Sequence, residues 1–91
     1  MELLALSDTQ QAGLAAELIR FLDQADEHLE RRSKAGTDYD RGLENGKALA
    51  FQASAMRVGE LVGLVTQGMS EKVDDQVAEL RNRAMAAAAG K

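Results

Sequence analysis

Residues 38–67 read DYDRGLENGKALAFQASAMRVGELVGLVTQ, and this stretch predicts one long helix in a chain of 91 residues that contains no proline. Gly42, Gly46, Gly59 and Gly63 lie inside it in two GxxxG spacings. Glycine in a helix interior costs about 1 kcal/mol relative to alanine, so a compensating contact is expected. Close approach of a second helix backbone is the contact that such spacings favour, by a rule established in membranes.

The helix expected over residues 38–67 carries two apolar seams on adjacent sides. A helix that is apolar on two sides is typical of the middle of a bundle, so we expect this helix to be the central one. The first two glycines belong to the second seam, which packs either on a neighbouring helix of the same chain or on a second chain. Gly59 and Gly63 face another way and mark either a second close contact or a soft point in the helix. The predicted packing seam consists of Gly42, Gly46, Leu49, Ala53, Met56 and Leu64.

A second long helix is expected over residues 8–33. Ser7 and Gln10 have the spacing of a capping box, in which each side chain reaches the backbone N–H of the other. Apolar residues then recur every three or four positions as far as Leu29, as on one face of a helix. Only residues 34–37 separate this helix from the next, and so short a turn predicts an antiparallel hairpin.

A third helix is expected over residues 71–89, with Ser70 as its cap and acidic residues in its first turn. Its apolar stripe is narrow and becomes rich in alanine toward the end. No repeat of fixed period and no long linker divides the chain, so one domain is expected over residues 1–91. The predicted fold class is therefore all-α, an antiparallel helical hairpin plus a third helix, similar to a three-helix bundle.

The composition indicates that this bundle is completed by dimerisation. Apolar residues form 45% of the chain, but aromatic residues form only 3% and many of the others are alanine. A chain of this size buries roughly 60 to 65% of its unfolded surface, so a monomeric core would be thin. The long helices also expose more apolar stripe than one chain can cover. We therefore expect a homodimer that forms a larger helical bundle.

Four carboxylates recur at three- and four-residue steps on one face of the helix over residues 8–33. Two interpretations stay open. The strip either docks a basic surface, including one that normally binds nucleic acid, or is a solvated face relieved by Arg31 and Lys34. The predicted acidic docking strip consists of Asp23, Asp26, Glu27 and Glu30.

Catalytic and metal-binding residues are not predicted. His28 is the only histidine, cysteine is absent, and no HExxH spacing occurs. In a di-iron bundle glutamate precedes the histidine by three residues, but that position holds Ala25. One histidine also cannot supply a nucleophilic triad. We expect a protein that is not an enzyme and has no cofactor.

The charge distribution bears on partners and location. The 15 acidic and 11 basic residues leave a formal charge of -4, which disfavours direct binding to nucleic acid. No apolar run approaches the ~20 residues that span a membrane, and the first residues carry no basic leader region. A cytoplasmic location is the default expectation.

The length of the hairpin resembles that of the small secreted WXG-type proteins of actinobacteria, whose fold is a dimeric four-helix bundle. The signature tryptophan is absent, however, and the turn reads Lys34-Ala35-Gly36-Thr37. No family is therefore assigned. The abundance of alanine and the preference for arginine over lysine are typical of a GC-rich genome, such as that of an actinobacterium or its phage.

These observations predict a helical protein–protein interaction module that associates with itself and with an unidentified protein partner. It would act as a small adaptor or as an inhibitor of a larger protein, with a phage or mobile element as one expected origin. The alternative is an acidic decoy that blocks a nucleic-acid-binding surface through the acidic strip.

Overall fold

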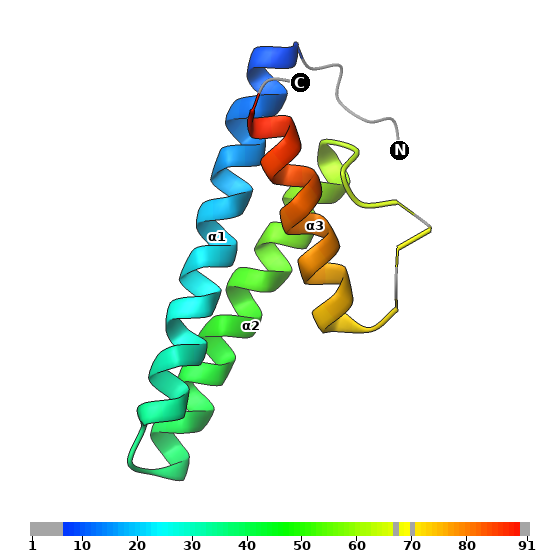
Figure 1. Ribbon diagram of the computed structural model, residues 1–91. Helices are drawn as coiled ribbons and strands as arrows, with labels where there is room; N and C mark the ends of the chain where they lie inside the picture. Colours follow the sequence, from blue (N-terminus) through cyan, green and yellow to red (C-terminus); the bar gives the residue numbers. More distant parts are fainter. Residues whose placement is uncertain (1–6, 67, 70, 90–91) are drawn as a thin grey trace.

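Three helices account for most of the molecule. Figure 1 shows a computed structural model of the chain, which describes residues 7–66, 68–69 and 71–89. The helices are α1 (Asp8–Lys34), α2 (Asp38–Leu61) and α3 (Val73–Ala88), and no described residue lies in a strand. The predicted all-helical, three-helix fold is thus confirmed. None of the helices in the described ranges is long and apolar enough to cross a membrane. The cap expected at Ser70 lies outside those ranges.

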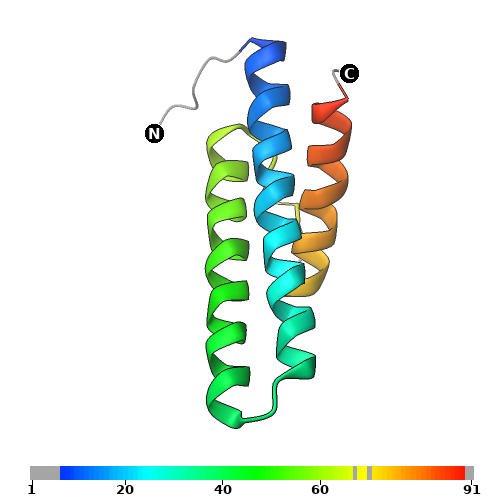
Figure 2. The ribbon, with the colours of Figure 1, turned by 90° about the vertical axis from the view of Figure 1, so that its left-hand side faces the viewer.

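The hairpin of α1 and α2 begins and turns where the local sequence signals place it. Ser7 and Gln10 form the expected capping box: the Gln10 N–H donates to Ser7 Oγ at 3.1 Å, and the Ser7 N–H donates to Gln10 Oε1 at 3.0 Å. Thr37 caps α2 by accepting a hydrogen bond from the Asp40 N–H at 3.1 Å. With only three residues between the helices, α2 runs back antiparallel along α1 (Figures 1 and 2).

Helix α2 ends at Leu61, six residues before the expected end at 67. Gly63 adopts a left-handed conformation with φ of 78°, which glycine reaches without steric cost and which ends the helix. The chain then folds back, because the N–H groups of Leu64 and Val65 both donate to the Gly59 carbonyl, at 2.8 and 3.2 Å. The prediction of one helix over 38–67 is therefore wrong in its last part.

Gly59 makes a close contact within the chain. A Cβ atom built there would lie 2.7 Å from Val65 Cγ2 and 2.9 Å from Leu80 Cδ1. Both distances are shorter than any normal carbon–carbon contact. Of the two roles expected for Gly59 and Gly63, the close contact therefore belongs to Gly59, whereas Gly63 ends the helix.

Side-chain hydrogen bonds from both flanking helices hold the segment that follows α2. Gln11 Nε2 donates to the Val62 carbonyl at 3.2 Å, and Arg83 Nη1 donates to the Leu64 carbonyl at 3.0 Å. The first comes from α1 and the second from α3, so both flanking helices fix this segment. It contributes Met69, which is buried in the core.

The central helix is α1, not α2 as expected. Figure 2 shows α1 between the other two helices, and α1 packs extensively on both, whereas α2 and α3 meet over a short length. The reason lies in the side chains that each helix buries. Leu18 and Leu22 of α1 are fully buried, but the buried residues within α2 are only Ala48, Ala55 and Gly59. Helix α2 therefore buries only small residues inside the chain.

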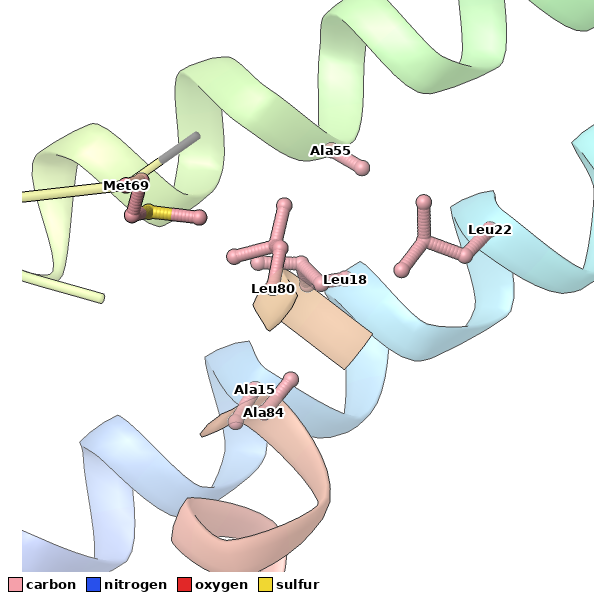
Figure 3. Packing of buried hydrophobic residues seen from close by; sticks show 7 residues of the cluster. All are labelled: Ala15, Leu18, Leu22, Ala55, Met69, Leu80 and Ala84. Atoms are coloured by element: carbon pink, nitrogen blue, oxygen red, sulfur yellow. The ribbon is translucent and has the colours of Figure 1, made fainter. Parts of the chain in front are cut away.

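The core lies at the end of the molecule where all three helices meet. Figure 3 shows its buried cluster: Ala15, Leu18, Leu22, Ala55, Met69, Leu80 and Ala84. The three leucines supply the large fully buried side chains, and the alanines let the helices approach. At the opposite end α1 and α2 continue beyond the start of α3, so this turn end is a two-helix structure (Figure 1).

Candidate interaction surface

One side of α2 is apolar and faces away from the rest of the chain. At 100° per residue, its members lie opposite the buried residues Ala48 and Ala55. Its large side chains are strongly exposed: Leu43 by 46%, Leu49 by 53% and Tyr39 by 78%. We call this surface the outer face of α2; it consists of Tyr39, Gly42, Leu43, Gly46, Leu49, Ala50 and Ala53.

The two glycines of the outer face have no steric reason to be glycine inside this chain. A Cβ atom built at Gly42 or Gly46 meets nothing within 4 Å among the residues that the structure describes. The interpretation in which these glycines pack on a neighbouring helix of the same chain therefore does not hold there. The other interpretation, packing against a second chain, stays a prediction.

The residues of the predicted packing seam lie in two different environments. Gly42, Gly46, Leu49 and Ala53 lie together on the outer face. Met56 and Leu64 are partly buried and pack against the core cluster instead. Leu64 lies there because α2 ends at Leu61, so the residues after Gly63 no longer follow the helical spacing.

The outer face carries no charge between its two ends. The charged residues of α2 within this stretch fall on other sides of the helix: they are Asp40, Arg41, Glu44 and Lys47. The charged side chains that border the face are Asp38 at one end and Arg57, with its partner Glu60, at the other. An uncharged, apolar face of four turns with charges at its ends has the composition of a protein–protein contact, with an apolar centre and a polar rim.

The acidic strip is partly occupied by α3. Arg81 donates one hydrogen bond to Asp23 at 2.8 Å and another to Asp26 at 2.7 Å, and so links α1 to α3. Glu30 pairs with Lys34 at 3.1 Å on its own helix. Glu27 is exposed. The four carboxylates therefore share a face, but two of them bind an arginine that is more than fifty residues away in the chain and that sequence reasoning missed.

His28 belongs to the contact between α1 and α2. Its side chain is buried, its ring stacks on Phe51 with centroids 5.6 Å apart, and its Nδ1 lies 2.5 Å from Glu44 Oε2. The hydrogen bond with His28 lowers the pKa of Glu44; partial burial opposes the shift, and the positive charges of Lys47 and Arg31 add to it. These contacts join α1 to α2 near the turn.

The register of the hairpin could have revealed this contact. Residues of two antiparallel helices that face each other are equidistant from the turn, which is centred near Gly36. His28 and Glu44 are each eight residues from that position, and Phe21 and Phe51, whose ring centroids are 6.4 Å apart, are each fifteen residues from it. Counting outward from the turn therefore predicts both pairs.

The described ranges contain neither a metal-binding cluster nor a pocket. No group of three or more His, Asp or Glu side chains there could hold a metal ion, and no pocket opens on that part of the molecule. Comparison of the chain with protein-family models, with curated proteins and with solved structures finds no match. The outer face of α2 is thus the feature that geometry singles out.

Proposed function

We propose that the protein is a non-enzymatic helical interaction module that associates with itself through the outer face of α2 and acts as a small adaptor or inhibitor of a larger protein. The single observation that carries this proposal is the outer face itself, where large apolar side chains and two sterically unconstrained glycines lie together without charge. Each glycine costs the isolated helix about 1 kcal/mol. A second chain packed there would compensate by burying the exposed leucines, at about 25 cal/mol per Å².

Self-association also fits the size of the core. The largest fully buried side chains are Leu18, Leu22 and Leu80, all at the three-helix end. At the turn end α1 and α2 have no third helix against them. A second copy on the outer face would add helices beside α2 and form a layer like that of a four-helix bundle.

The experiment that tests the proposal compares two charge insertions. Leu49→Glu places a carboxylate in the middle of the outer face, whereas Val73→Glu places one at an equally exposed apolar position at the start of α3. We expect light scattering to show a dimer for the natural chain and for Val73→Glu at tens of micromolar. Leu49→Glu should weaken dimerisation by more than about tenfold, because a buried unpaired charge is strongly unfavourable.

Two outcomes of that experiment would contradict the proposal. One is a natural chain that stays monomeric at tens of micromolar. The other is a dimer that Leu49→Glu and Val73→Glu weaken equally. Circular dichroism of both variants shows whether the helices remain intact.

The acidic decoy is the second candidate, and one observation bears on it. Glu27 and Glu30 are exposed carboxylates of the strip that do not pair with α3. Reversing Asp23 or Asp26 would break the link to Arg81 and disturb the fold, so the informative variant is Glu27→Lys with Glu30→Lys. The decoy hypothesis predicts that this variant loses binding to a basic nucleic-acid-binding protein. Retained binding would contradict that hypothesis.

A further inference from the structure

The two ends of the outer face carry opposite charges that are exposed. Asp38 precedes the face and its side chain is 97% exposed; Arg57 follows it and its side chain is 78% exposed. Each has a partner one turn away on its own helix, Arg41 for Asp38 and Glu60 at 4.0 Å for Arg57. Both charged groups therefore remain at the surface, at the level where a second helix lying on the face would reach them.

From this charge pattern we infer that two copies of the chain pair through the outer faces of α2 in antiparallel alignment, with Asp38 of each copy facing Arg57 of the other. The inference rests on the proposed function, because it names the partner and its orientation. A parallel pair would place Asp38 beside Asp38 and Arg57 beside Arg57, and like charges at an interface are unfavourable. In the antiparallel pair both repulsions become attractions, and the dipoles of the two helices point in opposite directions, which is favourable.

The alignment that joins these charges also gives the glycines a role. If Asp38 is level with Arg57 of the second copy, the two-fold axis passes at the level between Lys47 and Ala48. Gly46 then faces Leu49 of the second copy, and Gly42 faces Ala53. Each glycine thus receives a side chain from the other helix, and the axes can approach to the short end of the usual range of about 8 to 10 Å.

Cross-linking reads this orientation directly, because the chain has no cysteine of its own. Asp38→Cys and Arg57→Cys each introduce a single thiol at an exposed position. We expect a short bis-maleimide to join the two variants when they are mixed and to leave each one unlinked alone. The reason is distance: in the antiparallel dimer, like positions lie nineteen residues apart along the helix axis, or about 28 Å.

The outcomes separate the orientation from the proposed function. Strong linking of each variant to itself, with no link between the two different variants in the mixture, means a parallel pair and overturns the inference while self-association stands. A dimer in solution that gives no link in any sample means another face or register and also overturns it. A monomer throughout removes both the inference and the proposed function.

Charge exchange tests the same pair without a cross-linker. Asp38→Arg and Arg57→Asp should each weaken dimerisation by about three- to tenfold, because each creates two repulsive contacts per dimer. The double variant should recover the natural affinity to within about twofold. Asp40→Arg is the matched control, since it removes a carboxylate from the same helical turn but from another side of α2, and it should leave the affinity unchanged.

Failure of the double variant to recover, or equal weakening by Asp40→Arg, would contradict the pairing of Asp38 with Arg57. Association only with a different protein, and not with a second copy, would contradict it as well.

Discussion

The two ends of the molecule are held together by different chemistry. At the three-helix end, Leu18, Leu22 and Leu80 are fully buried and pack with small residues from all three helices. At the turn end α1 and α2 meet over Ala25 and Ala48, which bury little area. Polar and aromatic contacts supplement them, chiefly His28 with Glu44 and Phe51, and Arg32 with Asn45 at 2.7 Å.

The difference follows from helix length. Helix α3 has 16 residues and α1 has 27, so at about 1.5 Å per residue α3 covers roughly 24 Å of a helix that is roughly 40 Å long. The uncovered part of the hairpin is the part that carries Tyr39, Gly42 and Gly46 on its outer face. Large side chains are therefore fully buried at one end, whereas the turn end leaves Tyr39 and Leu43 exposed.

The largest effect should come from the three-helix end. Leu80→Ala removes a fully buried α3 side chain from the core where all three helices meet, and we expect it to lower the free energy of unfolding by about 2 to 5 kcal/mol. Urea denaturation measures the loss. Met85→Ala, at an exposed position of the same helix, should change stability by less than about 0.5 kcal/mol. Equal losses for the two would contradict the core described here.

Gly59→Ala tests the close contact at the same end. The added methyl group would press on Val65 and Leu80, so the side chains must shift, and the gain in helix propensity offsets only part of that strain. We expect a net loss of about 1 to 2 kcal/mol in thermal or urea unfolding. A stabilised variant would show that the contact at Gly59 is loose.

Gly42→Ala should have the opposite sign, because the outer face leaves room for the methyl group. In dilute solution, where the chain is monomeric, we expect the variant to be more stable by about 1 kcal/mol. At concentrations that favour the dimer the gain should shrink, since the methyl group would hold the second helix away. Unfolding measured at two protein concentrations checks both parts, and a loss in dilute solution would show that Gly42 is constrained within its own chain.

The smallest effect concerns acid at the turn end. The hydrogen bond with His28 holds the pKa of Glu44 below its ordinary value of 4.5, so the carboxylate contributes stability above that pH and the contribution is lost as the pH falls through the lowered pKa. Glu44→Gln should therefore flatten the decline of unfolding free energy below pH 4.5. His28→Gln should flatten it too, because the shift depends on that side chain. An unchanged pH profile in both variants would contradict the contribution of the hydrogen bond between His28 and Glu44 to stability.

Much of the fold could be predicted from short-range signals. The capping box at Ser7 and the short turn before α2 act within a few residues, and each lies where expected. The end of α2 could not be predicted in this way, because Gly59 and Gly63 have the same spacing as the other pair. The two pairs differ in their tertiary contacts. The Gly59 carbonyl accepts hydrogen bonds from the segment that folds back after α2, and Leu80 of α3 fills the space above Gly59.

The position of α1 as the central helix could not be predicted either, because the spacing of apolar residues does not show which helix packs on both of the others. Helix α2 has two apolar seams, but the part of the glycine seam from Gly42 to Ala53 packs on no other part of the described chain. The candidate surface was predicted in part for the same reason: four of its residues follow helical spacing, whereas Met56 and Leu64 turn to the core. The link from Arg81 to Asp23 and Asp26 joins helices that only the third dimension brings together.

The most direct test of the central claim replaces the two glycines of the outer face with a large side chain. Both positions are open in the single chain, so Gly42→Leu with Gly46→Leu should keep or raise the melting temperature measured in dilute solution. Sedimentation equilibrium at tens of micromolar should then give a mass near 9.8 kDa for this variant and near twice that for the natural chain. A variant that still associates as strongly as the natural chain would contradict the claim that a second helix packs against these glycines.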